Sequence, residues 1–128
     1  MNDERIKLSK EALEGGVGVI AAAGYINNEG GQAIADAASE LMSEGCATLL
    51  IDLEGTRIIN SIGVSILLEI MEKLLEDDGR LAFCNLTPTI SKTFEIMGLV
   101  QYAAIYENRD AAFGELGTDV TGQAPNAG

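Results

Sequence analysis

Asn60 and Ser61 are the residues of this sequence whose types and spacing best suit chemistry. They follow a short apolar run that ends at Leu53 and a polar turn, and they precede a long segment with helical period that runs to about Asp77. Asn and Ser side chains cap helices because their oxygens accept hydrogen bonds from the first free backbone N–H groups. We therefore expect the Ser61 hydroxyl at the positive end of a helix, just past a turn that leaves the sheet.

The acidic composition restricts the classes of partner and of chemistry. The 128 residues carry a formal charge of −12 and include no His. A strongly acidic surface repels phosphate backbones and anionic lipid, so we expect no direct contact with nucleic acid and none with membranes. His is the commonest general base and a common metal ligand, and no GxSxG, P-loop or dinucleotide fingerprint is present. The sequence therefore predicts a protein that is not an enzyme and that has no cofactor and no metal site.

Cys46 and Cys84 are the only cysteines, and each stands beside an apolar run without any CxxC pattern. We expect two reduced, buried thiols, with a single disulfide left open as the alternative. The charged first residues do not have the pattern of a signal peptide, and the longest apolar stretch, Val17 to Ala23, is far shorter than the ~20 residues that span a bilayer. These features predict a cytoplasmic protein.

Periodicity divides the chain into alternating strands and helices. Alternation of this kind predicts parallel βαβ units with right-handed crossovers, and an opening hairpin across Gly15-Gly16 adds an antiparallel edge. The fold class is therefore α/β, a single domain over 6–116 with a mixed, mostly parallel sheet, between a flexible N-terminus (1–5) and a disordered tail (117–128). The expected strands are 6–13, 17–26, 47–53, 80–85 and 102–106, the four expected helices are 32–44, 61–77, 88–97 and 108–116, and 27–31 is expected to be a loop.

The helix expected from Ser61 to about Asp77 has two distinct faces. Ile62 interrupts the polar face, and either loop residues or a partner protein must cover it. Helix starts gather at the carboxyl ends of parallel strands, so Asn27, Asn60, Ser61 and Thr87 should lie along one edge of the sheet. One arc holds Val64, Leu67, Leu68, Ile70, Met71, Leu74 and Leu75, and the other holds Ser61, Ser65, Glu69, Glu72, Lys73 and Glu76, with Ile66 at the border.

This order of elements resembles the STAS domain of bacterial anti-sigma-factor antagonists, over nearly all of 6–116. The most specific part is 50–65, Leu-Ile-Asp-Leu-Glu-Gly-Thr-Arg-Ile-Ile-Asn-Ser-Ile-Gly-Val-Ser. The stretch from Leu86-Thr-Pro to Glu95-Ile-Met-Gly-Leu99 and the turn Gly24-Tyr-Ile-Asn27 support it. The resemblance is specific for the fold and less specific for the activity.

The resemblance implies a switch. In this family a serine at the start of the second helix is phosphorylated by a kinase that doubles as an anti-sigma factor. The unphosphorylated protein binds that kinase and frees the sigma factor, and a phosphatase resets the switch. Here the implied phosphoacceptor is Ser61, with Ser65 and Thr56 as fallback acceptors, and the implied partner-binding residues are Asn27, Asn60, Ser61, Ile62, Ser65 and Glu69.

Two departures from the family pattern keep other functions open. Asn60 stands where the family usually has Asp before the serine, and Asn27 replaces Asp in the earlier turn. Asn caps a helix about as well as Asp, but the charges are lost, which favours a second interpretation: a STAS scaffold or accessory subunit, of a signalling or transport complex, that is never phosphorylated. A receiver domain fits less well, because Asp52 ends a buried strand but the acidic pair and the lysine that receivers need are missing.

Overall fold

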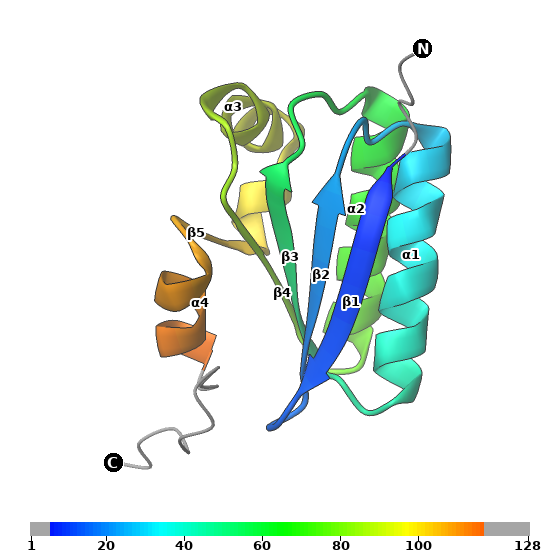
Figure 1. Cartoon of the computed structure of the whole chain (residues 1–128), viewed down its shortest axis with the longest axis vertical. Coiled ribbons are helices and arrows are strands. Elements are labelled where there is room, and N and C mark those ends of the chain that lie inside the picture. The colour runs from blue at the N-terminus through cyan, green and yellow to red at the C-terminus, as the bar shows by residue number, and fades with distance from the viewer. Residues whose placement is uncertain (1–5, 117–128) are drawn as a thin grey trace.

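The computed structural model describes residues 6–116, as five strands, four α-helices and a short 3₁₀ helix, η1 (Figure 1). The expectations for 1–5 and 117–128 lie outside the described residues. The strands are β1 (Lys7–Leu13), β2 (Val17–Ala23), β3 (Thr48–Gly55), β4 (Arg80–Cys84) and β5 (Ala104–Tyr106). The helices are α1 (Asn28–Ser43), α2 (Ser61–Glu76), α3 (Pro88–Met97), η1 (Leu99–Gln101) and α4 (Arg109–Leu116).

The sheet has the strand order β1-β2-β3-β4-β5. β1 pairs antiparallel with β2, and every later pair is parallel. The predicted α/β fold with an antiparallel N-terminal edge is thus confirmed. When successive parallel strands are neighbours and every crossover has the same hand, the crossover helices fall on one face of the sheet. α1 and α2 lie side by side on that face, whereas α4 lies on the other (Figure 1).

The core is divided by the sheet into a large and a small part. The large part joins the helix-facing side chains of β2, β3 and β4 to α1, α2 and α3, and includes an edge-to-face contact of Phe83 with Phe94 at 4.9 Å between ring centroids. The small part joins Val19, Leu50 and Cys84 to Phe113 of α4. Within the described residues no helix is long and apolar enough to cross a membrane.

α1 begins at Asn28, so the expectation that residues 27–31 form a loop and that the helix begins at Gln32 was wrong. Gly30 and Gly31 lie in the first turns of α1, where neighbouring atoms leave no room for a side chain. A Cβ on Gly30 would lie 2.5 Å from the Tyr25 carbonyl oxygen, and one on Gly31 would lie 2.8 Å from Ile66 Cδ1 of α2. Gly31 thus permits a close contact between α1 and α2, and Gly30 permits a close approach of α1 to the loop before it.

Other elements differ from the prediction mainly at their ends. β2 ends at Ala23 rather than Ile26, and β3 continues to Gly55. The last strand is shorter than expected, because η1 occupies part of the segment before Ala104. On α2, Leu75 was expected in the buried arc, but it is 42% exposed.

Candidate functional site

The two loops at the carboxyl edge of β2 and β3 are joined by backbone hydrogen bonds. Ile26 N–H donates to the Ile58 carbonyl at 3.0 Å, and Asn60 N–H donates to the Ile26 carbonyl at 3.1 Å. Ile26 also forms an isolated parallel bridge with Ile59. The starts of α1 and α2 are therefore held side by side, as Figure 1 shows at the upper end of the sheet. We call this edge of the domain, formed by the loops 24–27 and 56–60 and the first turn of α2, the rim.

Both helices at the rim are capped by asparagine. Asn27 Oδ1 accepts from Gly30 N at 2.9 Å, and Asn60 Oδ1 accepts from Gly63 N at 2.8 Å. Thr87 caps α3 in the same way, at 3.2 Å from Ile90 N. The capping role predicted for Asn60 is confirmed, whereas Ser61 is the first residue of the helix and not its cap. The first turn of α2 contains no acidic residue, so its positive dipole end has no carboxylate partner within the helix.

Gly63 fixes the first turn of α2 against the rim. A Cβ at this position would overlap the Ile26 carbonyl oxygen and would lie 2.9 Å from Ile26 Cγ2. Only glycine permits this approach without a shift of backbone. The position of Ser61, two residues earlier, is therefore set by contact between two backbones.

Ser61 is exposed at the first position of α2, and its carbonyl accepts a hydrogen bond from Ser65 Oγ at 3.0 Å. Ile62 beside it is 53% exposed, so the alternative that loop residues cover this side chain was wrong. Ile58 of the neighbouring loop is 59% exposed. A hollow of about 410 Å³ opens here between Tyr25, Arg57 and Ile58.

The remaining predicted site residues do not all reach the rim. Glu69 is exposed, but it lies two turns along α2 and lines a hollow between α1 and α2 that also contains Lys73. Thr56 is fully buried and its hydroxyl donates to the Ala22 carbonyl at 3.1 Å, so it does not offer the accessible acceptor expected of a fallback site. Asn27 is half-buried, and its side-chain oxygen is occupied by the cap of α1.

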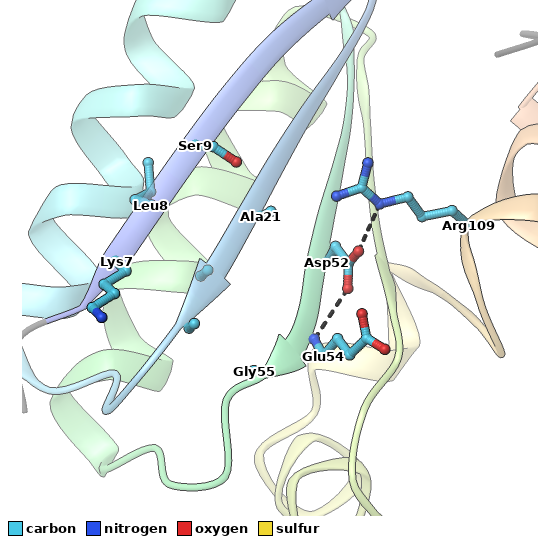
Figure 2. Close-up of a pocket in the computed structure, with 10 residues that line it drawn as sticks. Lys7, Leu8, Ser9, Ala21, Asp52, Glu54, Gly55 and Arg109 are labelled. Carbon is cyan, nitrogen blue, oxygen red and sulfur yellow. Dashed lines mark hydrogen bonds and ion pairs between the residues drawn. The ribbon is translucent and has the colours of Figure 1, made fainter.

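A second polar cluster lies on the face of the sheet that carries α4 (Figure 2). Asp52 Oδ2 accepts from Arg109 Nε at 2.6 Å, and Oδ1 accepts from Asn85 Nδ2 and Glu54 N, both at 3.0 Å. Burial by itself would raise the pKa of Asp52, but these hydrogen bonds and the Arg109 charge outweigh it and hold the pKa below its usual range. With all these donors on its two oxygens, the carboxylate serves as an anchor for α4. Sequence analysis singled out Asp52 but missed its partners.

Neither cysteine is placed for nucleophilic chemistry. Cys46 and Cys84 are buried and free, which confirms the expected reduced thiols. Burial and the nearby Asp52 charge raise the pKa of Cys84 to about 12, and burial raises the pKa of Cys46. Both thiols are therefore protonated near neutral pH. Within residues 6–116 no group of three His, Cys, Asp or Glu side chains is arranged to hold a metal ion.

The strand order, the N-terminal hairpin and the layer of crossover helices define the α/β class with the SpoIIAA-like fold. Residues 12–112 match the STAS domain family, and the chain belongs to that family.

Similar proteins are named as anti-sigma factor antagonists. BtrV of Bordetella bronchiseptica, which carries that name, is 23% identical over 107 residues, or 84% of this chain and 91% of that protein. An anti-sigma factor antagonist from Mycobacterium paratuberculosis superposes with a TM-score of 0.77 at 24% identity, over 89% of this chain and 96% of that one. The anti-sigma factor antagonist SpoIIAA superposes in its unphosphorylated form with a TM-score of 0.70 at 20% identity, over 86% and 97% of the two chains. SpoIIAA of Bacillus in its phosphorylated form superposes with a TM-score of 0.66 at 23% identity, over 83% of this chain and 96% of that one.

Proposed function

We propose that this protein is an anti-sigma-factor antagonist that works by partner switching. Unphosphorylated, it binds an anti-sigma-factor serine kinase; phosphorylated on Ser61, it is released, and a phosphatase restores the first state. The observation that carries this proposal is the exposed Ser61 hydroxyl at the start of α2, beside the exposed apolar side chains of Ile58 and Ile62. The similarity to SpoIIAA, for which a phosphorylated form has been solved, supports it.

The domain itself has the features needed to tolerate a phosphate on Ser61. The modification adds a charge of about −1.5 to −2. The first N–H groups of a helix have no partners within the helix, and an anion at this end gains ~0.3–1 kcal/mol from the dipole. Because the first turn of α2 contains no acidic residue, no carboxylate in that turn repels the new charge. The fold should therefore be unchanged by phosphorylation.

A partner docked on the rim would not tolerate the same charge. Ile58, in the loop before α2, and Ile62, next to Ser61 in its first turn, are exposed apolar side chains, and Ile58 also lines the hollow beside Tyr25. A phosphate pressed against these apolar side chains by a docked partner must lose its water, which is costly. Loss of ~3–4 kcal/mol of docking energy weakens binding by a few hundredfold, which is enough for a switch.

The proposal assigns no enzymatic activity to the protein, and it places the protein in the cytoplasm, where a kinase, ATP and a sigma factor are available. The members of the partner-binding surface are Asn27, Asn60, Ser61, Ile62 and Ser65, with Glu69 further along α2.

The direct test is phosphorylation by a physiological partner. The tagged protein is used to capture its binding proteins from the source cells, and the recovered kinase is then incubated with the protein and ATP. Mass spectrometry should locate the phosphate on Ser61, and a Ser61→Ala variant should remain unmodified while it still binds the kinase. Phosphate found on another residue, or a partner without kinase activity, would contradict the proposal.

A non-phosphorylated scaffold is the second candidate. It is favoured by Asn27 and Asn60, because both retain the capping hydrogen bonds while they lack the negative charge of the Asp expected at these positions. On this alternative, partners bind Ser61→Ala and Ser61→Glu variants equally, and the kinase assay leaves the protein unmodified.

A further inference from the structure

A groove with apolar walls lies between the second half of α2 and the end of α3 with η1. Leu68, Met71 and Leu75 form one wall, and Met97 and Tyr102 form the other, around a volume of about 630 Å³. The exposed fractions of Leu75, Met97 and Tyr102 are 42%, 40% and 64%. We call this the α2–α3 groove.

Exposed apolar side chains are concentrated in the part of the chain that forms the groove. β5 has only three residues at the edge of the sheet, and η1 is a single turn, so neither covers the outer side of α2. Exposed apolar patches of this kind mark sites where another molecule binds. Of the eight large hydrophobic side chains that are exposed in the described part of the chain, three line the groove, Leu75, Met97 and Tyr102, and three more come from the segments that form or follow it, Ile96, Val100 and Ile105.

The charged side chains at the groove are acidic, which favours a partner with cationic side chains. Glu72 is the single charged residue among those that line it, and Glu76 follows four residues later on the same side of α2. The nearest cation on α2, Lys73, lines the hollow toward α1 instead. The apolar wall from Leu68 to Leu75 extends ~10 Å, which matches the i, i+3 or i+4, i+7 anchors of a docked helix.

A second copy of this chain fits the groove poorly. A twofold contact would bring the same surface of each copy together, so that Glu72 and Glu76 of the two copies would approach each other. Both copies would also carry a net charge of −12. Like charges at an interface are unfavourable, whereas a cationic flank would be attracted.

We propose that the α2–α3 groove binds an amphipathic helix of a partner protein, with its apolar stripe on Leu68, Leu75 and Met97 and with Lys or Arg along the flank that meets Glu72 and Glu76. This surface begins ~10 Å along α2 from Ser61, so it is separate from the rim. The two methionines suit such a contact, because their flexible side chains adapt to the shape of a partner. The inference goes beyond the proposed function and does not depend on phosphorylation.

NMR titration of the ¹⁵N-labelled full chain tests the site with three synthetic peptides of about five helical turns. One is an amphipathic Leu/Lys helix, the second replaces every Lys by Glu, and the third has the first peptide's composition in a scrambled, non-amphipathic order. The Leu/Lys helix should bind at least tenfold more tightly than either control and should shift the amide signals of residues 68–76 and 97–102. Equal binding by the scrambled peptide, or shifts confined to the rim or to other acidic surfaces, would overturn the proposal.

Matched variants locate the contact. Leu75→Ser, Met97→Ser and Glu72→Lys should each weaken binding of the Leu/Lys peptide at least fivefold. Ile62→Ser, on the same helix and similarly exposed, and Glu44→Lys, with the same charge change at the carboxyl end of α1 and outside the groove, should alter it less than twofold. Melting temperatures within a few degrees of the wild type confirm that each variant is folded.

Two further measurements separate this inference from its rivals. Sedimentation velocity should show that the protein is monomeric; a dimer that Leu75→Ser dissociates would overturn the proposal in favour of a second copy. Ser61→Glu should leave peptide binding unchanged, so failure of the switch at Ser61 and failure of the α2–α3 groove would be recognised independently.

Discussion

Asp52 of β3 and Arg109 at the start of α4 form an ion pair, with 2.6 Å between Oδ2 and Nε, although they are 57 positions apart in the sequence. The carboxylate is almost fully buried, whereas the arginine side chain remains 40% exposed. Figure 2 shows the arginine reaching from α4 to the carboxylate on β3. The pair connects the last helix to the centre of the sheet, on the face opposite the other helices.

Arg109→Ala should destabilise the domain by about 1–3 kcal/mol, because it leaves a buried carboxylate without its charged partner. Urea unfolding measures the change. Lys7→Ala, which removes a cation from the same face of the sheet, should cost less than about 0.5 kcal/mol.

The same pair gives the stability of the protein a defined pH dependence. Since the folded-state pKa of Asp52 is lowered, its contribution is fully present above the ordinary Asp value of ~3.9 and is lost as the pH falls through the folded-state pKa. The difference in stability between wild type and Arg109→Ala should therefore be constant above about pH 5 and should shrink in more acidic solution. A difference that grows on acidification would contradict the assignment.

Gly63→Ala should destabilise the protein by about 1–3 kcal/mol, because the new methyl group would overlap the Ile26 carbonyl. Gly114→Ala is the matched control: it is also inside a helix, but a Cβ there has nothing within 4 Å. That control should stabilise the protein by about 0.5–1 kcal/mol through helix propensity. Thermal unfolding of the two variants should thus show shifts of opposite sign; shifts of the same sign would mean that the contact between Gly63 and Ile26 is not rigid.

Most of the fold follows from the sequence pattern, because helical and strand periodicity reflect which side chains are buried. The helix α2 was expected to begin at Ser61, and it does, because Asn60 is a strong capping residue with a clear local signal. α1 was placed four residues too late, since the glycines at 30 and 31 are typical of loops when only propensity is considered. Their true role depends on the distance to Tyr25 and Ile66, which local sequence does not contain.

The candidate site was also predicted only in part, because some of its features are local in the sequence and others depend on tertiary structure. The capping by Asn60 and the position of Ile62 on the polar face of α2 are local properties of a helix start, and they were visible in the sequence, whereas the exposure of Ile62 required the structure. The partners of Asp52 come from α4 and from the end of β4, and only tertiary structure brings them together. Leu75 was expected to be buried because helical periodicity assigns a face but does not show how far neighbouring elements extend over it.

Asn60→Ala should cost about 1 kcal/mol of stability, because the N–H of Gly63 loses its acceptor. Asn60→Asp should be nearly neutral, within about 0.5 kcal/mol, since Asp caps equally well. If the missing carboxylate slows recognition by the kinase, the Asp variant should be phosphorylated on Ser61 faster than the wild type. Chemical denaturation and a timed kinase assay check the two parts separately, and an unchanged rate would show that this carboxylate has no part in recognition.

Cys46 and Cys84 should react with a thiol reagent such as DTNB only when the protein unfolds. Both are buried, and the pKa of Cys84 is raised to about 12, so little thiolate is available at pH 8. The reaction should be slow in buffer and rapid for two thiols in denaturant. Rapid labelling of native protein would contradict the packing around these residues.

The central claim is that a negative charge on Ser61 prevents docking without affecting the fold. The most direct measurement is the dissociation constant of the recovered kinase for Ser61→Ala and Ser61→Glu, together with the unfolding free energy of each variant. We predict that Ser61→Ala binds like the wild type and that Ser61→Glu binds a few hundredfold more weakly, with stability equal to the wild type or higher by up to ~1 kcal/mol. Equal affinity of the two variants, or weak binding by a Ser61→Glu protein that has lost its fold, would contradict the claim.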